Sequence, residues 1–214
     1  MEVRELFGGA LSASIPAAFL DLSCARPVPD NQEVFSEGGS GGAVLIVEVV
    51  EFQAAVDAGD IARYLWEDLA ECNGAVSSRW RELSFEMGGG GGGGGVTAIP
   101  SSRWLGRCNA VRGGVGFHEV SGRGEAPSLL TCVALGVLRL PGEASEVVAS
   151  AAVPVEGPEA EAAAGAAAAR AEALLNALLP SIRVNDWALF GGGEEAGEGG
   201  GAAEGQIEGR AETG

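Results

Sequence analysis

The sequence predicts an α+β domain in which a central antiparallel β-sheet is flanked by helices, as an α/β/α sandwich. Two long apolar runs, at residues 43–52 and 128–140, have the composition of buried strands. Pro141-Gly142 and an alternating segment at 147–155 follow the second run, which is the spacing of a hairpin. The alanine-rich residues 159–179 predict a long helix. Because the strands are grouped ahead of this helix, the pattern favours an antiparallel sheet over a doubly wound parallel one.

Two further strands are predicted in the N-terminal part of the chain. Residues 11–15 alternate apolar side chains with serines and end at Pro16, as a half-buried strand does. A rigid connection over residues 26–32 precedes a strand that begins at 33–35. The run at 43–52 comes next; it is rich in β-branched residues and apolar on both faces, so it is predicted to be an inner strand.

A helix is predicted from Asp60 to Cys72, where apolar residues recur at helical spacing. Asp60 has the side chain of an N-cap residue, and Asn73-Gly74 is typical of a helix end. The opposite face is acidic and is expected to be a solvated surface. Its acidic residues are Glu67, Asp68 and Glu71.

The middle of the chain gives weaker signals. A strand is predicted around residues 80–85, and the unbroken glycine run at 88–95 is predicted to be a flexible loop insertion. One or two more strands are expected within residues 104–120, around 110–115 and 115–120.

These elements predict one folded domain at residues 1–190 followed by a disordered tail at 191–214. Pro180 ends the long helix, and a glycine-rich, alanine-rich and acidic segment begins after Phe190. Such a composition buries too little apolar surface to fold and is expected to solvate itself.

The charge of the chain excludes some classes of partner. The formal net charge is -17, with 30 acidic and 13 basic residues. A phosphate backbone is bound by concentrated basic residues, so nucleic acid is not expected as a direct ligand, and a basic protein partner is favoured. The longest apolar run, at residues 129–138, is about half of the roughly 20 residues that a membrane helix needs, so no membrane association is expected.

The sequence does not indicate an enzyme, a metal site or a cofactor. The four cysteines are scattered without a C-x-x-C pair, which disfavours zinc and fits reduced thiols in the cytosol or nucleus. The glycine run has no following lysine to hold a phosphate, and no G-x-S-x-G motif is present. An enzyme that uses His118, the single histidine, is kept as an alternative; adjacent Glu119 would point to the opposite strand face.

The residues that stand out are Glu48 and Glu51, because carboxylates are rare inside an apolar strand unless they have a partner or a function. In an unbroken strand the two side chains project to opposite faces, so a joint site requires the regular pairing to end or bulge near Val50. The alternative is structural: Glu48 pairs with an arginine such as Arg63, and Glu51 marks the exit of the strand.

Several blocks of the chain resemble one family. They are Leu6-Phe-Gly-Gly-Ala10, Pro29-Asp-Asn-Gln-Glu-Val-Phe35, Leu45-Ile-Val-Glu-Val-Val-Glu51, Arg63-Tyr-Leu-Trp-Glu-Asp-Leu69, Val133-Ala-Leu-Gly-Val-Leu-Arg-Leu140 and Asp186-Trp-Ala-Leu-Phe190. In this order they resemble the Ran guanine nucleotide release factors, the Mog-type Ran-binding proteins. Residues 75–128, the glycine run and the tail carry little of the resemblance.

The resemblance implies a partner and a site. The partner would be the small GTPase Ran, and the function would be promotion of guanine nucleotide release in nuclear transport, by a monomer located in the nucleus and cytoplasm. The family's acidic pair falls on Glu48 and Glu51, and Asp30, Gln32 and Glu33 are further contact candidates. Asp30 after Pro29 can also be explained as a turn residue. Since the family shares its fold with the photosystem II protein PsbP, a structural or assembly role in a photosynthetic complex is the alternative function.

Overall fold

A computed structural model describes residues 1–39, 42–87, 97–100, 104, 106–122, 128–155 and 160–191. The predicted loop insertion at 88–95 and residues 192–214 of the predicted tail lie outside the described residues.

The centre of the fold is a seven-stranded sheet in which every neighbouring pair is antiparallel. This confirms the predicted sheet type. In spatial order its strands are β3 (Leu20–Asp21), β4 (Gln32–Ser36), β5 (Val44–Glu51), β11 (Ser145–Pro154), β10 (Leu129–Leu140), β9 (Ala110–Val120) and β6 (Ala75–Leu83).

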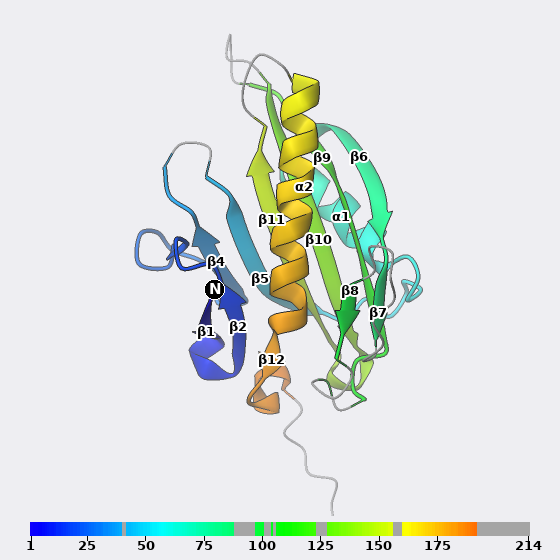
Figure 1. The fold of residues 1–214 in the computed structure, drawn as a ribbon. Coiled ribbons are helices and arrows are strands. Elements are labelled where there is room, and N and C mark those ends of the chain that lie inside the picture. The colour runs from blue at the N-terminus through cyan, green and yellow to red at the C-terminus, as the bar shows by residue number, and fades with distance from the viewer. Residues whose placement is uncertain are drawn as a thin grey trace, which may run out of the picture.

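Helices cover both faces of this sheet, as the predicted sandwich requires. α2 (Ala160–Leu178) crosses one face, and α1 (Ile61–Cys72) lies on the other (Figure 1). A small sheet shares the α2 side; its strands are β1 (Glu2–Leu6), β2 (Leu11–Ile15) and β12 (Arg183–Val184). A parallel pair, β7 (Phe85–Met87) and β8 (Thr97–Ile99), and short 3-10 turns complete the described elements.

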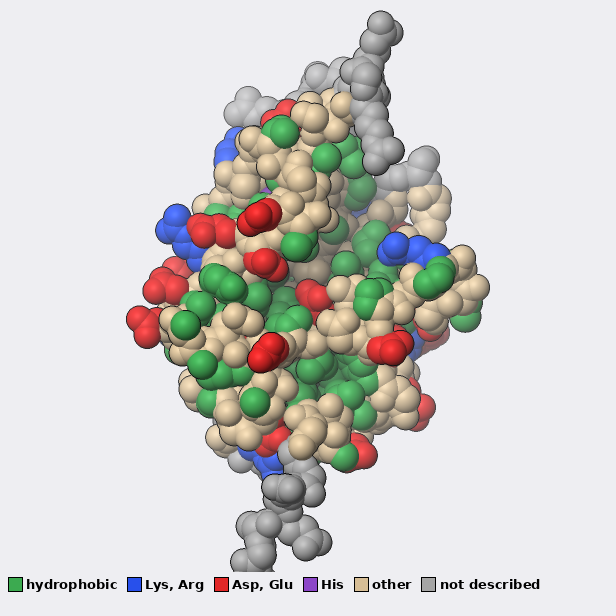
Figure 2. Space-filling model, turned by 180° about the vertical axis from the view of Figure 1, so that it is seen from behind, with side chains coloured by type: hydrophobic (Ala, Val, Ile, Leu, Met, Phe, Trp, Pro, Cys, Tyr) green, Lys and Arg blue, Asp and Glu red, His purple; other side chains and the backbone are tan. Residues whose placement is uncertain are grey.

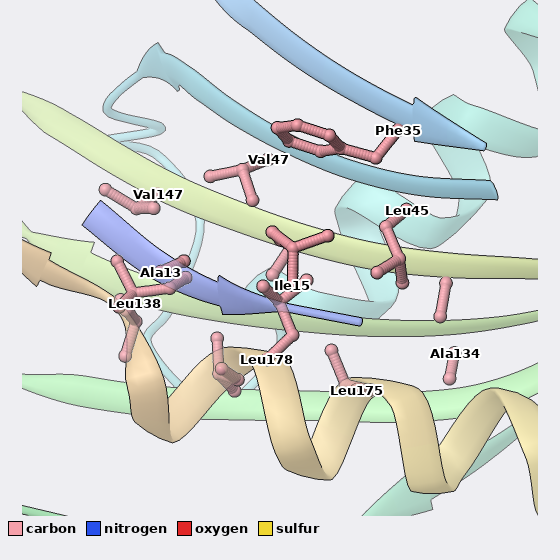
Figure 3. Close-up of a cluster of buried hydrophobic side chains, with 14 of the residues drawn as sticks. Ala13, Ile15, Phe35, Leu45, Val47, Ala134, Leu138, Val147, Leu175 and Leu178 are labelled. Carbon is pink, nitrogen blue, oxygen red and sulfur yellow. The ribbon is translucent and has the colours of Figure 1, made fainter. Parts of the chain in front are cut away.

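The larger hydrophobic core lies between α2, the small sheet and the central sheet. Leu175 and Leu178 of the helix face Leu45 of β5, with Ile15 of β2 between them, and all four are fully buried (Figure 3). A smaller cluster on the opposite face packs α1 against β10 and β11. The hairpin β10–β11 is therefore buried on both faces, which explains why β10 is apolar without alternation.

The ends of α1 follow the sequence prediction except for one detail. Asp60 occupies the predicted N-cap position directly before the helix, but its side chain makes no capping hydrogen bond. At the other end, Asn73 N–H donates to Leu69 O at 3.1 Å and Gly74 N–H donates to Glu71 O at 2.8 Å. Gly74 has a φ of +64°, a conformation that glycine adopts without strain.

Strand β9 is a single strand of 11 residues because its glycines make room for aromatic rings. A Cβ at Gly114 would lie 2.3 Å from the ring of Trp80, and one at Gly116 would lie 2.8 Å from the ring of Trp66. The rings therefore pack against the strand where side chains are missing, and this packing compensates for the poor strand propensity of glycine. Sequence patterns alone do not reveal such compensation.

We expect Gly114→Ala to destabilise the protein by about 1–3 kcal/mol, because the added methyl group overpacks a filled space beside Trp80. Urea unfolding followed by tryptophan fluorescence measures the change. Gly142→Ala is the matched control, since a Cβ there meets nothing within 4 Å. Equal effects of the two substitutions would contradict the packing explanation.

Candidate functional site

A groove lies on the α1 side of the sheet, between the helix and strands β4, β5 and β11. Its volume is about 190 Å³. The walls are mainly aliphatic, and the polar side chains come from both the sheet and the helix. The lining residues that matter for its chemistry are Gln32, Glu48, Asp68, Cys72 and Ser150.

Glu48 is half-buried in this groove and is held by a neutral partner. Gln32 is its cross-strand neighbour on β4, and Gln32 Nε2 donates to Glu48 Oε2 at 3.0 Å. Burial raises the pKa of the Glu48 carboxyl above its usual value, and the hydrogen bond from Gln32 lowers it. The negative charge of Asp68 adds to the rise in this pKa. Gln32 and Glu48, which were both predicted as contact residues, thus lie side by side and are hydrogen-bonded.

Asp68 is the part of the groove that the sequence pattern did not identify. It lies on the face of α1 predicted to be merely solvated, yet it lines the groove and interacts electrostatically with Glu48. The proposed ion pair between Glu48 and Arg63 is wrong, because Arg63 Nε pairs with Glu67 Oε1 at 3.0 Å on the same helix. Among the described residues, neither groove carboxylate forms an ion pair with a basic side chain.

Glu51 does not share the face of Glu48. Pairing between β5 and β11 is regular through Glu51, which lies opposite Ser145, and no bulge occurs near Val50. Residues three apart on an unbroken strand project to opposite faces. Glu51 is exposed at the end of β5 and does not line the groove, so its contact with a partner stays a prediction.

Glu33 has a contact inside the fold. Its Oε1 accepts a hydrogen bond from Phe7 N–H at 2.5 Å, across to the turn between β1 and β2. Phe7 has a φ of +51°, which is unusual for a side chain of this size. The carboxylate therefore anchors a tight turn on the α2 side, away from the groove.

Asp30 is exposed at the turn that leads into β4. Gln32 N–H donates to Pro29 O at 2.9 Å, which places Asp30 within a β-turn. The turn explanation offered for Asp30 is thus observed, and the side chain is also accessible to a partner.

His118 has the surroundings of a core residue rather than of a catalytic base. It is 2% exposed, and its ring lies 4.1 Å from the Trp66 ring, centroid to centroid. Neither ring nitrogen has a hydrogen-bond partner among the described residues. Burial lowers the pKa of His118, which favours the neutral imidazole. A substrate cannot reach this side chain in the described conformation.

The remaining side-chain chemistry can be described briefly. The four cysteines are unpaired; Cys24 and Cys72 are exposed, and Cys108 and Cys132 are buried. Within the described ranges, no group of three or more His, Cys, Asp or Glu residues is placed to hold a metal ion. No helix of the described chain is both long and apolar enough to cross a bilayer.

The groove opens on an acidic and apolar surface. Figure 2 views the α1 side and shows acidic side chains among hydrophobic ones, with arginines toward the margin. This surface is complementary to a partner that presents basic groups and some apolar area.

The chain matches a known family model over most of its described fold. Residues 4–154 match the model described as "Ran-interacting Mog1 protein". A Ran guanine nucleotide release factor of Danio rerio is 45% identical over 75 residues, and that of Homo sapiens is 50% identical over 70. These alignments cover 35% and 33% of this chain, and 40% and 37% of the relatives, so they span less than half of either relative.

A longer but weaker similarity extends over nearly the whole chain. The nuclear import protein MOG1 of Saccharomyces cerevisiae is 29% identical over 202 residues, which covers 87% of this chain and 83% of the relative. The crystal structure of the Ran-binding protein Mog1p from the same yeast superposes with a TM-score of 0.65 at 22% identity. It covers 88% of this chain and 97% of the other, which establishes the shared fold.

We expect the free energy of unfolding of a Glu48→Gln variant to increase relative to that of the wild type as the pH rises from below 4.5 to neutral. The raised pKa means that folded Glu48 binds its proton more tightly than unfolded Glu48 does. The resulting stabilisation is complete below the unfolded pKa and is lost as the pH rises through the folded pKa; the glutamine variant has no such loss. Urea unfolding over this pH range measures the difference, and a pH-independent difference would contradict the interpretation.

Proposed function

The chain belongs to the Ran-interacting Mog1 protein family, and we propose that it binds the small GTPase Ran and promotes release of the guanine nucleotide bound to Ran. The family match over residues 4–154 is the observation that carries this proposal. Relatives of the chain are named Ran guanine nucleotide release factor and nuclear import protein. We extend the same reasoning to its location, and propose that the protein acts in the nucleus and the cytoplasm as part of nuclear protein import.

The proposed mechanism is binding without covalent chemistry. A protein that prefers nucleotide-free Ran weakens nucleotide binding by the same factor by which nucleotide weakens its own binding. The chain therefore needs only a surface that contacts one state of Ran better than the other. No nucleophile, general base or metal is required for this activity.

The groove is the part of the surface that we propose as the main contact. Glu48 and Asp68 present two carboxylates beside an aliphatic wall. Charged groups that lie in a partly apolar groove are screened less by solvent than charges on an open surface, so a basic group of Ran gains more there. Gln32 orients Glu48, and we propose that Asp30 and Glu51 add contacts outside the groove. We assign Glu33 to supporting the turn at Phe7 on the α2 side.

We expect Glu48→Lys to slow Ran nucleotide release about tenfold or more, because it replaces a charge-assisted contact with repulsion. The measurement is release of a fluorescent guanine nucleotide from purified Ran, with far-UV circular dichroism to confirm folding. Glu71→Lys is the control, since it makes the same charge change on exposed α1 surface outside the groove lining. If Glu48→Lys promotes nucleotide release from Ran at the wild-type rate, Glu48 is excluded from the contact.

Glu51→Lys, tested separately, distinguishes one surface from two. Because Glu51 lies on the opposite face, we expect a smaller loss than for Glu48→Lys. An equal or larger loss would show that the partner wraps the edge of the sheet.

Cross-linking gives a direct test of the contact, because the chain contains no lysine: all 13 of its basic residues are arginines. A carbodiimide joins carboxylates to amines. In a mixture with Ran, every lysine found in a cross-link must therefore belong to Ran. We expect peptides containing Glu48 or Asp68 to be joined to a lysine of Ran. Cross-links confined to the acidic residues on the α2 side, such as Glu172, would place the interface elsewhere.

A further inference from the structure

A buried ion pair lies at the end of the sheet where β5 ends. Arg139 of β10 and Glu146 of β11 are cross-strand partners whose side chains are 4% and 0% exposed. Arg139 Nε lies 3.4 Å from Glu146 Oε1. Arg139 Nη1 and Glu146 Oε2 have no hydrogen-bond partner in the described part of the chain. Buried charges that are incompletely bonded are costly, and apolar residues of similar size often give a more stable fold.

The two charged side chains hold the main chain just beyond β5. Arg139 Nη2 donates to Gln53 O at 2.7 Å, and Gln53 N–H donates to Glu146 Oε1 at 3.4 Å. The guanidinium also lies 4.4 Å from the ring centroid of Phe52, whose N–H donates to Ala144 O at 3.0 Å. Both polar groups of the Gln53 main chain are therefore bonded to side chains of opposite charge on the β10–β11 hairpin.

The segment that is held joins two parts of the candidate site. Glu51 immediately precedes it, and Val50, one residue earlier, lines the groove. After the segment, the chain leads to α1, which supplies Asp68 and the other wall of the groove. A displacement at residues 52–53 would thus move Glu51 and the start of the connection to α1 relative to Glu48.

We propose that Arg139 and Glu146 are positioning residues for the partner-binding surface, and that they act by fixing the exit of β5 through Gln53. The inference rests on the proposed function, because the surface that they position is the one assigned to Ran. Neither side chain touches the partner, since both are buried.

The test separates positioning from stability. In an Arg139→Met, Glu146→Leu double variant, apolar side chains fill the same space but cannot bond Gln53. We expect the thermal midpoint to stay equal or to rise. We also expect Ran nucleotide release to fall about tenfold, because small misplacements of contacting groups are costly. Unchanged release in a folded variant would overturn the proposal.

Two further variants serve as controls. Arg81→Met, Glu172→Leu removes an ion pair between β6 and α2 on the other face of the sheet, and we expect it to leave release unchanged. Arg139→Met, Glu146→Gln keeps an acceptor for Gln53 N–H, and we expect it to recover part of the release. If Arg81→Met, Glu172→Leu slows Ran nucleotide release as much as Arg139→Met, Glu146→Leu does, the effect is not specific and the proposal fails.

Hydrogen exchange of the Gln53 amide tests, without Ran, whether Arg139 and Glu146 hold the main chain at Gln53. We expect exchange at Gln53 to accelerate about tenfold or more in the Arg139→Met, Glu146→Leu variant, while amides at the centre of β10 keep their protection. A wild-type protein that fails to bind Ran would refute the proposed function but not the positioning. Unchanged Gln53 exchange would refute the positioning.

Discussion

Burial of the β10–β11 hairpin on both faces is the constraint on which the other elements depend. Its side chains alternate between a core under α2 and a smaller cluster under α1, so both helices must be present for the hairpin to leave water. The hairpin also fixes the register of β5 through β11. That register assigns Glu48 to the groove side and Glu51 to the opposite face, so the geometry of the candidate site follows from the packing of the core.

The parts of the fold that sequence patterns predicted are those with strong local signals. The strands at 11–15, 43–52 and 128–140 and both helices appear close to their expected bounds, because long apolar runs and helix stops act within a few residues. Strand β1 was missed, since it is short and polar and forms only against β2. The first half of β6 was missed, whereas residues 110–120, expected to form one or two strands, form the single strand β9.

The residues of the candidate site also divide into those that the sequence identified and those that only the folded structure brings together. Glu48 was identified from its apolar surroundings. The expectation that Glu48 and Glu51 point to opposite faces of an unbroken strand is confirmed, because β5 has no bulge. Asp68 could not be distinguished from its neighbours on α1, because only the packing of that helix on the sheet brings it to Glu48. The contact from Glu33 to Phe7 was equally beyond sequence reasoning, since it spans 26 residues of chain.

The distribution of arginines shows how the groove is kept available. Within the described ranges, six of them are paired with glutamates elsewhere in the fold: Arg4, Arg63, Arg81, Arg107, Arg139 and Arg170. Glu48 instead accepts a hydrogen bond from the neutral amide of Gln32, and burial raises the pKa of its carboxyl group. An arginine in place of Gln32 would relieve that burial cost and stabilise the folded chain. It would also occupy the position that we propose for a basic group of the partner, and the sequence has a neutral amide there instead.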